Sequence, residues 1–212
     1  MQLTKFTHSC VRFDDGDRSV VLDPGVFSEV EQALDGVDAV LITHEHPDHL
    51  DVDLVRAAAR ANSRLQIWAP AGVGHALGDL GEQVVAVGPG QTFEAGGFEV
   101  RAFGGQHAVI HPTIPVIANV GFLVEGVFHP GDSLIVPPAD VRTLLLPIHA
   151  PWSNIAQVID FAVSVRAPKT YPIHNSLLTP PGTAMVEALV TRIAGQFGSD
   201  YVHLDPHDIV DV

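Results

Sequence analysis

The sequence has little cysteine and no long apolar run. Cys10 is the single cysteine among 212 residues, which excludes an intramolecular disulfide. No apolar stretch approaches the roughly 20 residues that are needed to cross a bilayer. Residues 1–6 lack the basic segment followed by an apolar run that marks a secretory signal. We therefore expect a cytoplasmic protein that does not span a membrane.

Positive charge is also scarce. The chain has 11 Lys and Arg against 25 Asp and Glu, which gives a formal net charge of -14. Nucleic acids and anionic membrane surfaces are polyanions and would be repelled by such a chain. We therefore expect a small-molecule substrate and neither nucleic acid nor a membrane as partner. A homo-oligomer is compatible with this composition.

The apolar content is ample for one large core. With a mass of 22.6 kDa and 46% hydrophobic residues, the chain can bury enough surface to fold as one domain. We expect a single domain over residues 1–212.

Turn residues between alternating apolar residues predict several hairpins. Asp15-Gly16 is expected to close a hairpin within residues 2–22. Gly96-Gly97 predicts a second hairpin, and the apolar stretch 118–127 predicts a third.

Apolar residues at helical spacing predict three helices. The first follows Leu50, the second follows Ser153 as its N-cap, and the third opens at Thr179-Pro180-Pro181. The third helix is expected to turn Met185 inward. Residues 201–212 are expected to form one closing strand.

The densest group of polar residues follows a strand-like run at residues 38–43. His44-Glu45-His46-Pro47-Asp48-His49 places three imidazoles and two carboxylates within six residues. Imidazole is a common ligand of zinc and other divalent metals, and carboxylates bind metal or position water. A solvated loop or a polar helix start is the alternative interpretation. A rigid strand before the motif and a helix after it favour a metal site.

The H-x-H-x-D-H pattern resembles the signature of the metallo-β-lactamase superfamily. Further motifs follow in that family's order: Gly104-Gly105-Gln106-His107, Gly131-Asp132, and His174 after a predicted strand at 169–173. The resemblance implies an α+β fold, a four-layer αββα sandwich, with a one- or two-metal site at one edge.

The resemblance also implies a ligand set for two divalent metal ions. The first ion would be held by His44, His46 and His107, the second by Asp48, His49 and His174, and Asp132 would lie between them. Seven ligands are too many for one tetrahedral zinc. Zinc is the leading candidate, and manganese or iron also suits this set.

The implied activity is that of a dinuclear metal-dependent hydrolase. A metal-bound hydroxide, oriented by Asp48, would attack a small ester, lactone, thioester or phosphodiester. The family's flavin-linked diiron oxidoreductases have a glutamate where this chain has His46, which argues against redox chemistry. The alternative is a non-catalytic metal- or ligand-binding protein on the same scaffold.

Two residues near the start of the chain are candidates for supporting roles. In the resembled family an Asp at the position of Asp23 supports the metal-ligand loop, whereas the sequence alone also allows a turn-forming Asp. Thr7-His8-Ser9 resembles an element of the ascorbate-phosphate lactonase-like subgroup, with Thr7 in place of a Gly. His8 is therefore either at the site mouth or a hydrogen-bonded structural histidine.

A faint internal repeat singles out two further histidines. Residues 20–25 are echoed by residues 127–132, and the strand before His44 is echoed by the strand before His149. The echo makes His149 a candidate contact to substrate or to the metal ligands, with a backbone-bonded histidine as the alternative. His129 is expected to be structural or to support the ligands. His111 is expected to be a loop or substrate-side residue.

Overall fold

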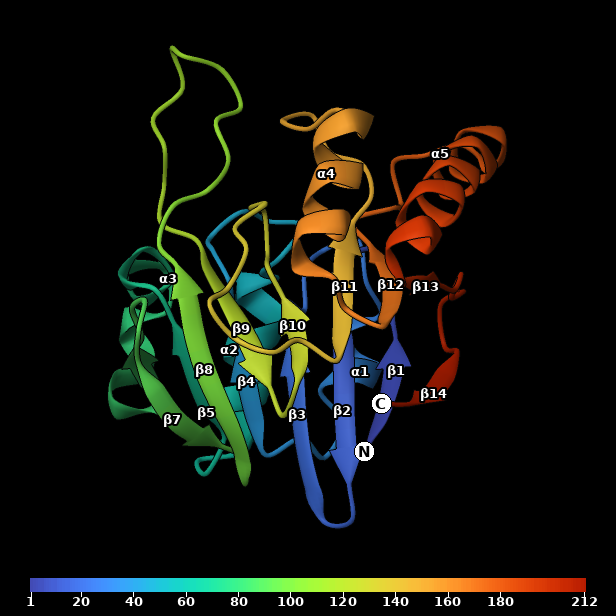
Figure 1. Cartoon of the computed structure of the whole chain (residues 1–212). Coiled ribbons are helices and arrows are strands. Elements are labelled where there is room, and N and C mark those ends of the chain that lie inside the picture. Colours follow the sequence, from blue (N-terminus) through green and yellow to red (C-terminus); the bar gives the residue numbers. More distant parts are fainter.

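Two seven-stranded sheets pack face to face in the computed structural model, which describes residues 1–212 (Figure 1). In spatial order the first sheet contains β14 (Ile209–Asp211), β1 (Gln2–Lys5), β2 (Val11–Asp15), β3 (Arg18–Leu22), β4 (Ala39–Leu41), β5 (Gln66–Ala69) and β6 (Val84–Ala86). The second sheet contains β13 (Asp200–Tyr201), β12 (Lys169–Ile173), β11 (Thr143–Pro147), β10 (Val127–His129), β9 (Val120–Val124), β8 (Phe98–Gly104) and β7 (Thr92–Ala95).

Helices cover the outer face of each sheet. On the first sheet lie α1 (Val30–Ala33), α2 (Val52–Ala61) and α3 (Ala71–Ala76), followed by a 3₁₀ turn at Gly78–Gln83. On the second sheet lie α4 (Ile155–Val165) and α5 (Pro180–Ala194), followed by a 3₁₀ turn at Gly195–Phe197. Three apolar clusters, one between the sheets and one under each helical layer, hold the four layers together. The predicted αββα sandwich is confirmed.

The three predicted hairpins form. They join β2 to β3, β7 to β8 and β9 to β10, each antiparallel. Each sheet also contains a run of four parallel strands. These are β3, β4, β5 and β6 in the first sheet, and β10, β11, β12 and β13 in the second. Parallel strands end at the same edge of a sheet, which brings the loops that follow them together.

Three details of the helices and the tail differ from expectation. The N-cap of α4 is Asn154, whose side chain accepts from the Gln157 N–H at 3.2 Å in a capping box, so the Ser153 prediction is wrong by one residue. Met185 is 64% exposed, because Val186 and Val190 form the inward stripe of α5.

The tail forms two short strands rather than one closing strand. β13 pairs with β12 in the second sheet, and β14 pairs with β1 in the first sheet. Pro206, which has no N–H to donate, and His207, with φ of 73°, interrupt the extended chain between them. No helix is both long and apolar enough to cross a membrane.

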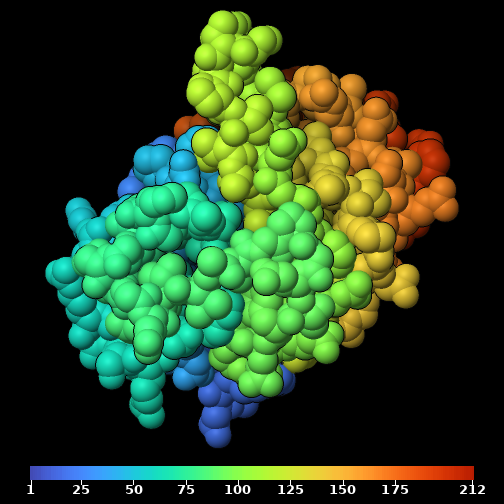
Figure 2. Space-filling model, turned by 90° about the vertical axis from the view of Figure 1, so that its left-hand side faces the viewer, coloured from blue at the N-terminus to red at the C-terminus, as the bar shows by residue number.

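The connection between β8 and β9 extends well beyond both sheets. Residues 105–119, which we call the β8–β9 arm, project from one end of the molecule in two perpendicular views (Figure 1 and Figure 2). Four of its apolar side chains are exposed: Val109, Ile110, Ile114 and Val116. His107 lies at the start of the arm, so this end of the molecule also carries the predicted ligands.

Candidate metal centre

Four strand ends deliver the predicted ligands to one edge of the sandwich. β4 leads into the loop of residues 44–49, β8 leads to His107, β10 leads to Asp132 and β12 leads to His174. β4 and β10 are buried along their whole lengths, and β12 is buried from Thr170 to Ile173, which fixes where the loops after them begin.

The side chains gather in two candidate metal-binding clusters. Within each cluster the potential ligand atoms all lie within 4.8 Å of one another. The first cluster contains His44, His46, His107 and Asp132, and the second contains His8, Asp48, His49 and His174. All seven residues of the expected ligand set are therefore brought together, and His8 joins the second cluster.

Asp132 faces both clusters. Its Oδ1 lies 3.0 Å from Nε2 of His49, and its Oδ2 lies 3.2 Å from Nε2 of His174 and 3.3 Å from Nε2 of His107. The carboxylate is 3% exposed, so no bulk solvent satisfies it. This position between the clusters matches that expected of a shared carboxylate.

Several buried atoms of the site have no hydrogen-bond partner. They are Nε2 of His49, His107 and His174, and Oδ1 of Asp132. The other nitrogen of each ring is bonded: Nδ1 of His107 donates to the Ala108 carbonyl and Nδ1 of His174 to the His149 carbonyl, both at 2.6 Å. Because Nδ1 is engaged as a donor, Nε2 is the nitrogen of each ring that is available to bind a cation. Buried polar atoms without partners are costly, and a divalent cation satisfies this donor set.

Asp23 orients histidines of both clusters. Its buried carboxylate accepts a 2.6 Å bond from Nδ1 of His49 and bonds of 2.7 Å from the N–H and the hydroxyl of Thr43. The same Thr43 hydroxyl then accepts from Nδ1 of His44 at 3.0 Å. Hydrogen bonds of this kind fix the tautomer and the ring orientation of a metal-binding imidazole. The structure thus places Asp23 beneath the ligand loop, with Thr43 as a link that no sequence pattern indicated.

The carboxylates and imidazoles of the clusters shift one another's pKa values. Burial opposes charge on His49, yet the carboxylates of Asp132 and Asp23 raise its pKa well above the usual value. Burial also favours the neutral acid of Asp132, but His49 and the neighbouring imidazoles hold the pKa of this carboxyl well below its usual range. An ionised Asp132 therefore attracts cations into the site.

His8 is held tightly between two partners. Its backbone has φ of 65°, and its ring centroid lies 4.0 Å from that of His174. Nε2 lies 3.2 Å from Oδ2 of Asp48, and Nδ1 lies 2.8 Å from the Ser176 hydroxyl. Burial lowers the pKa of His8 to about 4, so the ring is neutral near pH 7 and carries one proton. Because an ionised Asp48 only accepts, that proton is on Nε2, and Ser176 donates to Nδ1.

Thr7, which stands where the lactonase-like element has a glycine, makes side-chain contacts of its own. Its N–H and its hydroxyl donate to the Glu29 carboxylate at 3.0 and 2.7 Å. Thr7 therefore anchors the loop before His8 through its side chain, a contact that glycine lacks.

The other singled-out histidines lie outside the two clusters. His129 is fully buried; its Nε2 donates to the Ser9 carbonyl at 2.9 Å, and its Nδ1 accepts from the Gly131 N–H. His111 is exposed on the β8–β9 arm and bonds Thr113. His129 thus has the surroundings of a structural residue, and His111 those of a loop residue.

His149 lies at the strand end that the internal repeat indicated. Its carbonyl, and not its imidazole, makes the contact with His174. The side chain is half-buried and does not line the cavity in front of the clusters. A contact between this imidazole and substrate stays a prediction.

Comparisons with known proteins identify the family to which this chain belongs. The sequence profile of the family described as Beta-lactamase superfamily domain matches residues 2–174. The chain is a member of the metallo-β-lactamase superfamily. Among the relatives, Protein Rv0786c of Mycobacterium tuberculosis is 37% identical over 199 residues, covering 91% of this chain and 92% of its own length.

Further relatives of this metallo-β-lactamase superfamily member carry functional descriptions. A UPF0173 metal-dependent hydrolase of Xanthobacter autotrophicus is 30% identical over 172 residues, covering 71% of this chain and 68% of its own length. The structure of Igni18, a metallo hydrolase from Ignicoccus hospitalis, superposes with a TM-score of 0.75 at 20% identity, over 99% of this chain and 97% of that one. The chain thus belongs among the metal-dependent hydrolases of the superfamily. None of these three relatives is described as an ascorbate-phosphate lactonase, and that subgroup stays a prediction.

One contact in this superfamily member was not foreseen from the sequence. The indole N–H of Trp152 donates to Oδ2 of Asp132 at 2.7 Å. The available signal was weak: Trp152 is one of only 2 tryptophans, and it stands three residues after His149 at a strand end. Trp152 thus orients the carboxylate of Asp132 that faces both clusters.

Proposed function

We propose that the protein is a dinuclear hydrolase of a small ester, lactone, thioester or phosphodiester. The observation that carries this proposal is the set of buried, unpartnered ligand atoms that converge from His49, His107, His174 and Asp132. Zinc is the leading metal on its preference for imidazole, and manganese or iron also suits the mixed imidazole and carboxylate set.

Divalent cations in such a site act as Lewis acids and make water acidic enough to lose a proton near neutral pH. The chain's own residues orient the reactants. Asp48 is the one carboxylate of the second cluster, and its side chain is 23% exposed toward the cavity. Burial works against its charge, but the nearby His174 imidazole, 3.5 Å away, and a hydrogen bond from His8 keep the pKa of Asp48 far below its usual value. Asp48 therefore stays an ionised acceptor, able to orient a water molecule through a hydrogen bond.

Metal analysis tests the proposal. We expect about two ions per chain in protein purified without chelators, and turnover on a panel of lactones, thioesters and bis-phosphodiesters. Asp132→Ala should lower both occupancy and turnover, because the shared carboxylate offsets repulsion between two cations. Asp132→Asn, which keeps the side-chain volume, separates loss of charge from misfolding.

His203→Ala is the matched control. His203 bonds Glu187 at 2.6 Å on the surface beside α5 and belongs to neither cluster. Its removal should leave metal content unchanged. One ion at full occupancy, with no second ion bound on titration, would contradict the dinuclear proposal. If the metal-loaded protein turned over no compound of the panel, the remaining function would be non-catalytic binding of metal or ligand.

A further inference from the structure

We infer that the substrate is a carboxylic ester or lactone whose remaining part is apolar and uncharged. This inference rests on the proposed hydrolytic function and narrows its substrate class. In the reaction, the oxygen of water bonds to the carbonyl carbon and the carbon–oxygen bond to the alcohol breaks. One proton of water leaves on the alcohol, and the other is released by the carboxylic acid.

The cavity in front of the clusters has two kinds of wall. Its volume is about 430 Å³, within the range of small-molecule sites. Every polar side chain of the wall, apart from the Trp152 indole, belongs to the two candidate metal clusters. The apolar wall consists of Val26, Phe27, Pro47, Ile110, Pro151, Trp152 and Leu177. The reacting group is thus confined to the clusters, and the remainder of the substrate meets apolar surface.

The residues of the apolar wall come from separate segments of the chain, and most of them are exposed to solvent. Val26 is 49% exposed, Phe27 44%, Ile110 37% and Leu177 50%. Residues 26–27 follow β3, Ile110 comes from the β8–β9 arm, and Leu177 follows β12. Exposed apolar side chains that converge from distant parts of the chain around a cavity mark a ligand site.

The apolar wall has no free polar side-chain group for a charged substituent. Its single polar side-chain atom, the Trp152 indole nitrogen, already donates its hydrogen to Asp132. A phosphate or carboxylate beside Phe27 and Leu177 would therefore be desolvated without a partner, which is strongly unfavourable.

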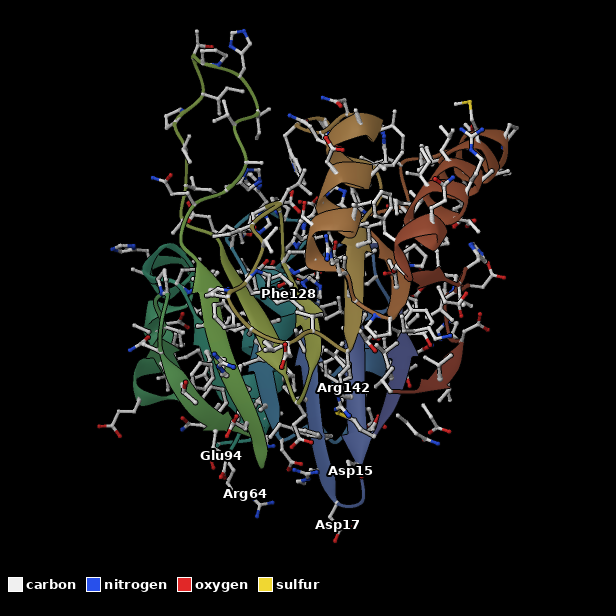
Figure 3. All side chains as sticks on the ribbon, viewed as in Figure 1. Asp15, Asp17, Arg64, Glu94, Phe128 and Arg142 are labelled. Carbon is white, nitrogen blue, oxygen red and sulfur yellow. The ribbon has the colours of Figure 1, made fainter.

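Basic residues are placed away from the cavity. None of the 12 residues of its wall is Lys or Arg. Lys5 is buried and donates to the His8 carbonyl, and Arg142 donates to the Glu125 carbonyl. Figure 3 shows Arg64 with Asp15, Asp17 and Glu94 at the end of the molecule opposite the β8–β9 arm. Sugar phosphates and thioesters of phosphorylated carriers would find no counter-charge here except the metal ions themselves.

Matched 4-nitrophenyl esters test the inference on the metal-loaded protein. A fully buried methylene favours binding about fourfold, so kcat/KM should rise at least about tenfold from acetate to hexanoate. Mono-4-nitrophenyl adipate has the same six-carbon acyl chain with a terminal carboxylate. We expect its kcat/KM to be at least about tenfold below that of the hexanoate.

Leu177→Lys should reduce or invert the preference for hexanoate over adipate, because it places a cation in the apolar wall. Met185→Lys is the control: Met185 is also exposed, on α5, but lies outside the cavity, so selectivity should not change. Binding of the neutral fluorescent probe N-phenyl-1-naphthylamine gives a readout independent of turnover. It should weaken at least about fivefold in Leu177→Lys and not in Met185→Lys.

The outcomes separate the inference from the proposed function. Hydrolysis of 4-nitrophenyl esters without chain-length dependence, or equal turnover of hexanoate and adipate, overturns the apolar class while the hydrolase stands. Turnover confined to bis(4-nitrophenyl) phosphate overturns the ester assignment alone. Probe binding that is indifferent to Leu177→Lys overturns the role of the cavity wall. Absence of any hydrolysis by the loaded protein overturns the proposed function itself.

Discussion

Nε2 of His8 donates a 3.2 Å hydrogen bond to Oδ2 of Asp48. This bond joins the loop after β1 to the ligand loop after β4, 40 residues apart in sequence. Ser176 bonds the other ring nitrogen, so one buried imidazole connects three loops at the site. His8 thereby fixes the orientation of the carboxylate proposed to handle water.

His8→Asn should separate orientation of Asp48 from metal binding. Asparagine tolerates the left-handed backbone of this position, so the fold should persist. We expect metal content near wild type and turnover at least about tenfold lower, equivalent to about 1.4 kcal/mol of barrier. Ser176→Ala, which removes only the outer bond, should have a smaller effect. Loss of an ion in His8→Asn would show instead that His8 is itself a ligand.

Gly25→Ala should disturb the ligand loop through the backbone. A Cβ at Gly25 would lie 1.9 Å from the carbonyl oxygen of Asp48 and 2.5 Å from the N of His49. Because a backbone cannot move aside as a side chain does, we expect a loss of about 1–3 kcal/mol in urea unfolding and lower metal occupancy.

Gly72→Ala provides the contrast. Its Cβ would meet only the carboxylate end of the exposed Glu45 side chain, which can rotate away. We expect unchanged or slightly higher stability, because Gly72 lies in α3, where alanine is the better helix former. Equal losses in both glycine variants would contradict the close approach at Gly25.

Lys5 should make stability rise with pH in the alkaline range. Its buried ammonium donates to the Phe6 and His8 carbonyls, and burial lowers its pKa from 10.5 to about 8. Between these values the unfolded chain holds more protons than the folded one, so the free energy of unfolding increases with pH. Relative to Lys5→Met, the wild type should gain up to about 3 kcal/mol over this window. Denaturant midpoints at several pH values measure this gain in stability. Parallel curves of stability against pH for the two proteins would contradict the prediction.

His149→Gln tests the remaining histidine. Because the contact with His174 is made by the carbonyl of residue 149, which glutamine retains, metal content should stay near wild type. The proposed substrate contact of the imidazole further predicts turnover at least about tenfold lower. Wild-type kinetics on a confirmed substrate would leave the carbonyl as the only role of this residue.

The internal repeat has a physical counterpart in the structure. Asp23 and His129 each precede a Pro-Gly pair in the two echoed segments, after β3 and at the end of β10, and their side chains approach to 3.8 Å. The repeat was readable because both halves reuse a buried strand followed by a proline turn. That the two halves face each other was expected from the resembled fold and not from the repeat alone, because it depends on how the sheets stack.

The sequence by itself determined most of the strands and the candidate ligands that follow them. Hydrophobic runs, turn glycines and a compact histidine motif are local patterns, and local periodicity specifies local structure. The predictions for Ser153 as N-cap and Met185 as an inward residue were wrong by one position along the chain. The prediction of one closing strand was wrong because the tail can pair with either sheet, and it pairs with both. Only the tertiary structure decided that His8, Thr43 and Trp152 support the site and that Phe27, Ile110 and Leu177 surround it. Those contacts join side chains from distant segments, and no local pattern records which distant loops a packed pair of sheets brings together.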